Sequence, residues 1–383
     1  GPMVAVCPDR LKLYMHLVAS LRVAIKNQSM HWNLDSTATK NRLYRLIYGS
    51  RQALEEVMLQ VPRDTSLFDI MSYEEPSKTP FVTILGVKVH SGDILVSRGG
   101  APTSALIARG SDYPGNFSHV ALAHVDSGKV SIIEAHIEKG VTVSTLKEYL
   151  QDKKLRIMVL RLRSDLAALK ADPMLPHAVA TKMLENVKAR HIAYDFAMDV
   201  FDSSKMFCSE VASSPYRQFG ITLWKGISAI SSKGASSWLS AFGVKNFKTQ
   251  EPSDLEYDPQ LSVVAEWRDW ETLFKDHVDN AVIDAMLEGA ELGEQLKYDW
   301  YMLPIARIVK VYSLMLNLIG NVGPIPEGMN ATAALKNKRL TYRHTLIKTG
   351  VLKKASDFQV TYGYVPPYWH LLKLALQIEG YSK

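Results

Sequence analysis

Hydrophobic residues near the start of the chain recur every three or four positions, as they do on one face of an amphipathic helix. One such series runs from Leu11 to Ile25, and a second runs from Leu43 to Val61. A polar stretch at residues 33–41 separates the two series, and Pro62 follows the second. Because proline does not continue a helix interior, we predict two helices joined by a loop.

After Pro76 the pattern changes to short runs rich in β-branched residues, which are typical of strands. The runs that predict strands are 81–89, 93–97, 120–125, 129–135 and 155–162. Asp126-Ser127-Gly128 lies between the third and fourth runs and is a turn signal that favours an antiparallel hairpin. The middle of the chain is therefore expected to form a small, mostly antiparallel sheet.

Helical spacing returns in the second half of the chain. It predicts helices at 165–169, 177–189 and 208–219, loop with short helices over 226–240, and helical structure at 263–319 and 331–383. Breaks are expected at Pro215, at the connector 320–328, and at Gly350, Gly363 and Pro366-Pro367. These patterns divide the chain into an N-terminal helical region (3–77), a central region that contains the sheet (78–268) and a C-terminal helical region (269–383).

The composition is that of a globular protein. The chain has 383 residues, of which 47% are hydrophobic and 22% charged, with a formal net charge of +6. The simpler interpretation of this mild positive charge is that it keeps the protein soluble. The alternative is that it attracts an anionic partner, such as a phospholipid surface or a cell-wall polymer. No nucleic-acid motif accompanies it, so nucleic acid is not an expected partner. The two cysteines, Cys7 and Cys208, are far apart, so neither a disulfide framework, a metal site nor a cofactor is expected.

Targeting segments are not expected. Gly1-Pro2 ahead of Met3 resembles a remnant of tag removal. Charged residues interrupt the first apolar series, so a signal peptide is not predicted. The stretch 311–326 is shorter than the roughly 20 residues that a membrane-spanning helix needs. A cytoplasmic location is the default expectation, and delivery out of the cell stays open.

Cys208 is the first candidate for chemistry because it begins a predicted helix. Helix amides and the positive helix end lower a thiol pKa and can hold a developing oxyanion. A base must also reach the sulfur. His119, at the mouth of a predicted strand, is the best placed histidine, and its rivals are His90, His124, His136 and His191. The simpler alternative is a buried, inert cysteine.

The predicted hairpin supplies a partner for His119. If Ser127-Gly128 is a two-residue turn, Asp126 pairs with Lys129, Ala121 with Glu134 and His119 with His136. Glu134 then becomes a diagonal neighbour of His119 on one face of the sheet. A carboxylate in that position orients the imidazole and stabilises its charged form. His136 is the alternative orienting residue.

Several short segments, taken in order, resemble a known family. They are Ser91-Gly92-Asp93-Ile94-Leu95, Phe117-Ser118-His119-Val120-Ala121-Leu122, Ile133-Glu134-Ala135, Gly140-Val141, Tyr194-Asp195-Phe196 and Phe207-Cys208-Ser209-Glu210. The order histidine, acid, cysteine is similar to that of the YiiX/YaeF family, circularly permuted members of the NlpC-type papain-like superfamily. The resemblance covers about 87–266 and implies an α+β fold, with a permuted papain-like core and a small antiparallel sheet between helical terminal regions.

The resemblance also implies roles for individual residues. Cys208 is expected to be the nucleophile, His119 its base and Glu134 the orienting acid, while Tyr194 and Ser118 are expected to bind substrate. A core aromatic is the simpler interpretation of Tyr194. The implied activity is that of a thiol hydrolase, which forms an acyl-enzyme and cleaves an amide bond in a peptide or isopeptide, such as a cell-wall peptide.

Two other functions stay open. The first is a lipid-directed thiol esterase, phospholipase or acyltransferase resembling lecithin:retinol acyltransferase. For that function, a predicted helix at 304–319 with a wide apolar face and a nearby basic run would rest on an anionic membrane. The basic run comprises Lys336, Lys338, Arg339, Arg343 and Lys348. A buried core helix beside a solvated basic face is the simpler alternative. The second is a non-catalytic binding module. Nothing in the sequence bears on the oligomeric state.

Overall fold

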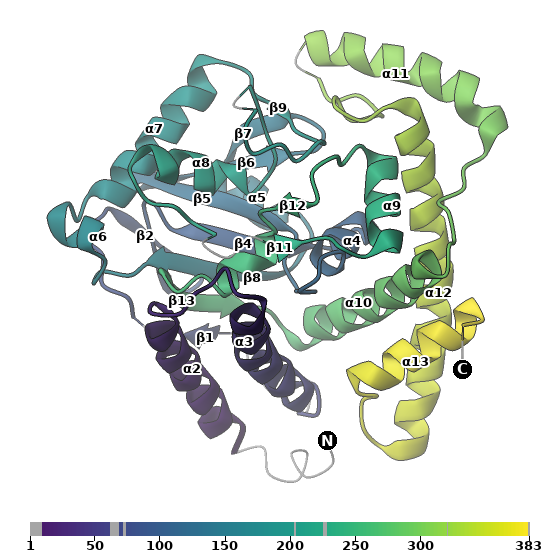
Figure 1. Cartoon of the computed structure of the whole chain (residues 1–383), viewed down its shortest axis with the longest axis horizontal. Helices are drawn as coiled ribbons and strands as arrows, with labels where there is room; N and C mark the ends of the chain where they lie inside the picture. The colour runs from purple at the N-terminus through teal and green to yellow at the C-terminus, as the bar shows by residue number, and fades with distance from the viewer. Residues whose placement is uncertain are drawn as a thin grey trace.

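A seven-stranded antiparallel sheet lies at the centre of the described part of the chain (Figure 1). The computed structural model describes residues 10–61, 69–71, 74–202, 204–224, 228–319 and 321–381. The strand order is β1-β13-β8-β4-β5-β6-β7. These strands are β1 (Asp69–Met71), β4 (Ile94–Gly99), β5 (His119–Asp126), β6 (Lys129–His136), β7 (Gly140–Thr145), β8 (Lys154–Leu162) and β13 (Leu261–Trp267).

Three short pairs of strands lie outside the main sheet. They are β2 (Phe81–Ile84) with β3 (Val87–His90), β9 (Ala193–Tyr194) with β10 (Lys205–Met206), and β11 (Ser228–Ala229) with β12 (Lys248–Thr249). The predicted strand 81–89 is therefore a hairpin, which turns at Leu85 and Gly86. Both turn residues have positive φ angles, and glycine adopts this conformation without steric cost.

Helices form the rest of the regular structure. The first of them are α2 (Arg10–Ser29), α3 (Thr37–Met58), α4 (Pro102–Arg109), α5 (Leu146–Gln151), α6 (Ala167–Ala171), α7 (Leu175–Ala189) and α8 (Glu210–Gln218). The later ones are α9 (Lys233–Phe242), α10 (Trp270–Glu291), α11 (Leu303–Leu318), α12 (Ala331–Tyr362) and α13 (Tyr368–Glu379), with 3₁₀ turns η1 (Pro252–Glu256) and η2 (Trp300–Met302).

The sheet is buried on both faces. Val96, Leu122 and Leu160 point into a core that they share with helices α7 and α8. Leu95 and Val159, each one position away, point into a second core on the opposite face. Successive side chains of a strand alternate between faces, so a strand covered on both sides reads as a continuous apolar run. That is the pattern from which these strands were predicted.

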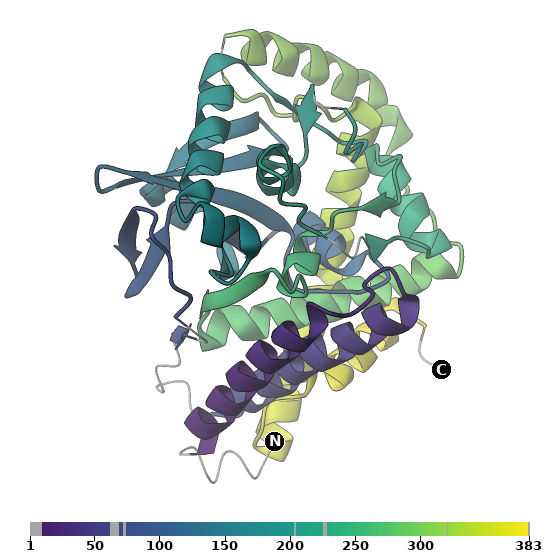
Figure 2. The ribbon, with the colours of Figure 1, turned by 60° about the vertical axis from the view of Figure 1, so that its left-hand side comes forward.

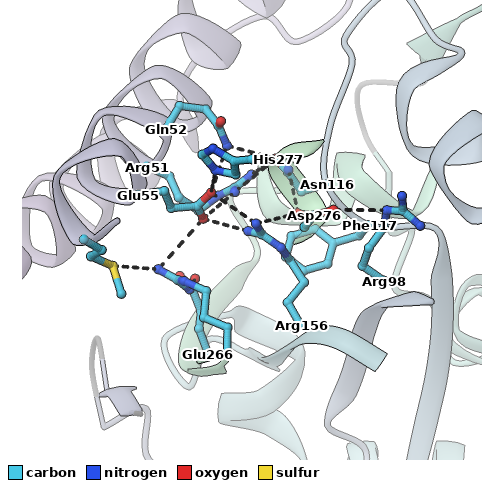
Figure 3. A network of polar contacts seen from close by, with 12 residues as sticks. Arg51, Gln52, Glu55, Arg98, Asn116, Phe117, Arg156, Glu266, Asp276 and His277 are labelled. Atoms are coloured by element: carbon cyan, nitrogen blue, oxygen red, sulfur yellow. Dashed lines mark hydrogen bonds and ion pairs between the residues drawn. The ribbon is translucent and has the colours of Figure 1, made fainter. Parts of the chain in front are cut away.

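Buried ion pairs fix the N-terminal helices to the sheet (Figure 3). Glu55 of α3 is fully buried, and its carboxylate accepts hydrogen bonds from Arg51, from Arg156 of β8 and from His277 of α10. A buried carboxylate is tolerated only when cations and hydrogen-bond donors replace its hydration. This cluster therefore joins α3, the sheet and α10 at one point, and Figure 2 shows α2 and α3 side by side beneath the sheet.

The C-terminal helices pack on one another around a separate apolar core, and α10 lies at its centre. That core includes Val282 and Met286 of α10, Leu340 and Ile347 of α12, and Leu371 of α13. Helix α11 lies at the outer edge of this group, and its contacts are with η2, α12 and the connector before α12 (Figure 1). No helix in the described ranges combines the length and apolar character needed to cross a bilayer.

The sequence predictions of structure hold for many elements, but α4, α5 and β7 were not predicted and several predictions fail besides the hairpin at 81–90. Helix α3 begins at Thr37, inside the predicted loop 33–41. Residues 263–267, predicted as helix, belong to strand β13. Helix α8 continues through Pro215, and α12 continues through Gly350. A Cβ atom at Gly350 would lie 2.9 Å from Ile378, so this glycine serves close packing with α13 rather than a helix break. Cys7 and Pro62 lie outside the described residues.

Candidate active site

Cys208 lies in the turn immediately before helix α8. The helix begins at Glu210, and Ser209 occupies its N-cap position. The Ser209 hydroxyl donates to the carbonyl oxygen of Gln250 at 2.6 Å, which anchors the turn. The Cys208 side chain is only 5% exposed, and its Sγ lies 3.9 Å from the carbonyl oxygen of Ser118. The sulfur therefore touches the residue that directly precedes His119.

His119 and Glu134 face each other across the hairpin of β5 and β6. The paired residues run from Ala121 with Glu134 to Asp126 with Lys129, which confirms this part of the predicted register. The distance from His119 Nε2 to Glu134 Oε2 is 2.9 Å. The predicted diagonal contact between the two side chains is therefore present. It follows from the turn alone, because the turn fixes which residues share a face.

Glu134 is surrounded by hydrogen-bond donors. Besides His119, the carboxylate contacts His136 Nε2 at 3.1 Å and accepts from the Ser144 hydroxyl at 2.6 Å. Burial by itself raises the pKa of the Glu134 carboxyl, but the hydrogen bonds from the two histidines outweigh it and hold that pKa well below its usual range. Glu134 is thus a fixed negative charge behind His119. Sequence reasoning missed Ser144, which comes from β7.

A cavity of about 120 Å³ brings four of the predicted residues together. Cys208, His119, Ser118 and Tyr194 all line it, and Glu134 lies behind His119. The rest of its lining is mostly polar or small and includes Ser97, Gly99, Ser104, His136, Glu138, Asp152 and Lys154. The Ser118 hydroxyl is buried and has no hydrogen-bond partner among the described residues. This cavity can therefore present polar groups to a substrate beside the sulfur.

The rival histidines lie elsewhere. His90 Nδ1 is 2.8 Å from the carbonyl oxygen of Thr79. His124 stacks on His177, and His191 pairs with Glu327. Among the rivals, only His136 reaches the candidate site, where it shares Glu134 with His119.

A second cavity of about 90 Å³ meets the same sulfur from another side. It is almost entirely apolar, and Cys208 and Tyr194 belong to both cavities. Its other lining residues include Leu106, Ile107, Ile137, Phe196, Met198, Phe207, Leu239, Phe242, Val244 and Met329. They come from α4, from α9, from the loop after Tyr194 and from the segment before α12. No local sequence pattern signals this cavity, since its walls meet only in the folded chain.

The thiol pKa differs from the sequence expectation. Burial raises the pKa of the Cys208 thiol to about 12. A hydrogen bond with the backbone of Val120 lowers the same pKa, but its effect is smaller. The helix start was expected to lower this pKa, and the loss of hydration outweighs that effect. Cys208 therefore rests as a neutral thiol. Any reaction at its sulfur requires a base that removes the proton during attack.

Comparisons with known proteins give a match for the central part of the chain, a little under half of its length. Residues 88–265 match the family described as permuted papain-like amidase enzyme, YaeF/YiiX, C92 family. This match confirms the resemblance seen in the sequence, and it includes Cys208, His119 and Glu134. No curated protein matches the chain.

One similar solved structure is the crystal structure of metalloprotein yiiX from Escherichia coli O157:H7. It is 18% identical, with a TM-score of 0.35, and the alignment covers 46% of this chain and 97% of that one.

Proposed function

From the match of residues 88–265 to the permuted papain-like amidases, we propose that this chain is a cysteine amidase that forms an acyl-enzyme on Cys208. The observation that carries the proposal is the contact between the sulfur and the Ser118 carbonyl. That contact brings the thiol to the residue beside His119, whose imidazole is held by Glu134. A nucleophile, a base and an acid that orients the base are the parts that such catalysis needs.

The contact with Glu134 supports one arrangement of the protons on His119 for this mechanism. Nε2 carries a hydrogen and donates it to the carboxylate, which leaves the Nδ1 lone pair to accept the thiol proton. The sulfur then attacks the carbonyl carbon of the amide. The backbone amide of Cys208, in the turn before α8, and a nearby donor stabilise the oxyanion.

Breakdown of this intermediate completes the cycle. The C–N bond breaks, and the imidazolium of His119 returns its proton to the leaving amine. Water then attacks the thioester while His119 again accepts a proton, and the products are a carboxylic acid and the free thiol. Glu134 keeps its charge throughout, because its pKa lies far below neutral pH. Its role is to stabilise the imidazolium that forms twice in each turnover.

Tyr194 and Ser118 are proposed to bind the substrate. Burial raises the pKa of the Tyr194 phenol well above its usual value, so the phenol stays protonated and can donate a hydrogen bond. The Ser118 hydroxyl lines the polar cavity without a partner of its own among the described residues. Both groups therefore have hydrogen-bonding capacity left for a carbonyl oxygen or another polar group of the substrate.

The apolar cavity supports a second candidate function. An acyl group with an apolar side chain or tail fits against Ile107, Phe196 and Phe242, with its carbonyl at Cys208. The same arrangement serves an ester or lipid substrate, so a thiol esterase, phospholipase or acyltransferase is the alternative. The bond that is cleaved distinguishes these functions. A non-catalytic binding module is disfavoured, because it does not require the contacts around His119.

Product analysis tests both candidates. The wild type, Cys208→Ala and His119→Ala are incubated separately with cell-wall peptide fragments and with phospholipids, and the products are identified by mass spectrometry. The amidase proposal expects a new amine and carboxylic acid from the peptides with the wild type alone, and a thioester adduct on Cys208. Products from phospholipids only would support the alternative. Equal product formation by the wild type and Cys208→Ala would contradict chemistry at this sulfur.

A further inference from the structure

Helix α11 exposes a continuous stripe of large apolar side chains. Ile305, Ile308, Tyr312, Met315 and Ile319 follow one another at spacings of three and four residues, which places them on one face of the helix. Ile308 is 71% exposed and Met315 is 61% exposed. With their exposed neighbours they form a surface that we call the α11 patch: Trp300, Tyr301, Ile305, Ile308, Val311, Tyr312, Met315, Leu318 and Ile319.

The opposite face of α11 is the one that contacts the protein. Ala306 and Ser313 are its buried residues. The Ser313 hydroxyl donates to the Val309 carbonyl and accepts from the backbone amide of Ile325. A helix that packs on a core normally presents its large apolar residues to the core. Helix α11 does the reverse, so the α11 patch is not a surface that this chain buries within its described residues.

The charges on α11 itself are positive, and the acidic residues beside it are Asp299, which precedes Trp300, and Glu327 in the connector. The helix carries Arg307 and Lys310 and no acidic residue. Lys310 donates to the carbonyl oxygens of Pro326 and Glu327, whereas Arg307 is exposed. On the neighbouring helix α12, Lys338 and Arg339 are also exposed.

Two members of the predicted basic run do not contribute to this positive surface. Arg343 pairs with Glu294 and Glu379, and Lys348 pairs with Asp279.

We propose that the α11 patch docks this chain on an anionic lipid bilayer, with α11 lying in the plane of the headgroups. An amphipathic helix with an apolar face, basic residues and no acid is suited to that position. Trp300 and Tyr301, both exposed at the start of α11, have the aromatic and polar character typical of residues at a membrane interface. A second copy of the chain is less suitable, because a symmetric contact would bring two positively charged rims together.

The proposal does not depend on the reaction at Cys208. It therefore predicts that Cys208→Ala binds vesicles as well as the wild type does. It also predicts that a variant of the α11 patch still cleaves a water-soluble peptide, if the chain is an amidase. Failure of the docking proposal and failure of the proposed function are thus separate results.

Vesicle sedimentation tests the proposal. The full chain is mixed with vesicles of phosphatidylcholine, or of phosphatidylcholine with phosphatidylglycerol. We expect binding to the anionic vesicles that weakens as salt is added. The double variant Ile308→Ser and Met315→Ser is expected to bind more than about tenfold more weakly, because two apolar side chains leave the membrane. Arg307→Gln is expected to bind anionic vesicles about fivefold more weakly than the wild type and to bind neutral vesicles equally well.

A matched control comes from helix α2. Leu13 and Leu17 are 53% and 58% exposed and also lie four residues apart on one helix face. The double variant Leu13→Ser and Leu17→Ser is expected to leave vesicle binding unchanged. Circular dichroism and the melting temperature show that each variant is folded, which is expected because the altered side chains are exposed.

Three results would overturn the proposal. The first is absence of wild-type binding to anionic vesicles. The second is an equal loss of binding in the α2 and α11 variants. The third is a dimer in solution that the α11 variant abolishes without any effect on vesicles, since this result would assign the α11 patch to a second copy of the chain.

Discussion

The substitution Glu134→Gln isolates the contribution of the negative charge behind His119. Glutamine keeps the size of the side chain and removes the charge. In the wild type the Glu134 carboxylate lies 2.9 Å from His119 Nε2 and 3.1 Å from His136 Nε2, and it accepts from Ser144. The contact with His119 is the one that bears on proton transfer, because His119 must become positively charged whenever it accepts the Cys208 proton.

The size of the effect follows from that contact. A hydrogen bond to a charged group contributes about 1.5–3 kcal/mol. If Glu134→Gln loses this stabilisation of the imidazolium, the rate of acylation falls about 10- to 150-fold. Since the Cys208 thiol has a pKa raised to about 12 by burial, little thiolate is present at neutral pH to react without the base. The loss should therefore appear directly in the rate of reaction at the sulfur.

The assay is alkylation of Cys208 by iodoacetamide at neutral pH, followed by intact mass. Cys208→Ala corrects for labelling elsewhere in the chain. Glu138→Gln is the matched control, because Glu138 lines the same cavity but makes no ion pair with His119 among the described residues. We expect slow labelling of Glu134→Gln and wild-type labelling of Glu138→Gln. Equal rates in the wild type and Glu134→Gln, or an equal decrease in both variants, would refute the role given to Glu134.

Three further predictions concern stability. Glu55→Gln should lower the free energy of unfolding by about 3–5 kcal/mol in chemical denaturation, because the buried Arg51 and Arg156 lose one of the two carboxylates that compensate each of them. Glu185→Gln, at an exposed ion pair, should lower it by less than about 1 kcal/mol. Burial raises the pKa of the Glu251 carboxyl from 4.5 to about 8, so the folded state keeps a proton that the unfolded chain loses. The stabilisation from this proton is complete below pH 4.5 and is lost as the pH rises through 8. The free energy of unfolding should therefore vary by about 5 kcal/mol less across that range in Glu251→Gln than in the wild type. Gly140→Ala should lower the melting temperature, since φ is +73° and the new Cβ would lie 2.2 Å from the Ile192 carbonyl oxygen.

The part of the site that lies on the β5–β6 hairpin could be predicted from the sequence. A two-residue turn at Ser127-Gly128 fixes the register of the hairpin, and the register decides which side chains share a face. That reasoning placed Glu134 beside His119 without knowledge of any distant contact. It left His136 as an alternative to Glu134, whereas in the structure both histidines contact the same carboxylate.

Other features depend on contacts that no local pattern encodes. Residues 263–267 were predicted as the start of the helical region 263–319, and a short apolar segment has no distinct period that would separate it from a helix. It becomes strand β13 because β8 and β1 pair with its two edges. The pKa of Cys208 could not be judged from the start of a helix alone, since burial has the larger effect. Whether α11 is exposed or buried stayed open in the sequence, because an apolar helix pattern does not show which surface it faces.

The C-terminal region is connected to the candidate site through a short segment. Lys310 of α11 holds the carbonyl oxygens of Pro326 and Glu327. A Cβ atom on Gly328 would lie 2.5 Å from the ring of Phe196, so that ring packs directly against the glycine backbone. Phe196 and Met329 then form part of the apolar wall beside Cys208.

Two physical consequences follow from this connection. One residue of the apolar wall, Met329, lies outside the segment that matches the amidase family, so under the proposed function the C-terminal region would help to determine which acyl groups reach the sulfur. If α11 rests on a bilayer as proposed, the connector that it holds leads from the membrane-facing helix to the cavity wall. An apolar acyl group is then the type of substrate for which both features, the exposed helix and the apolar wall, have a use.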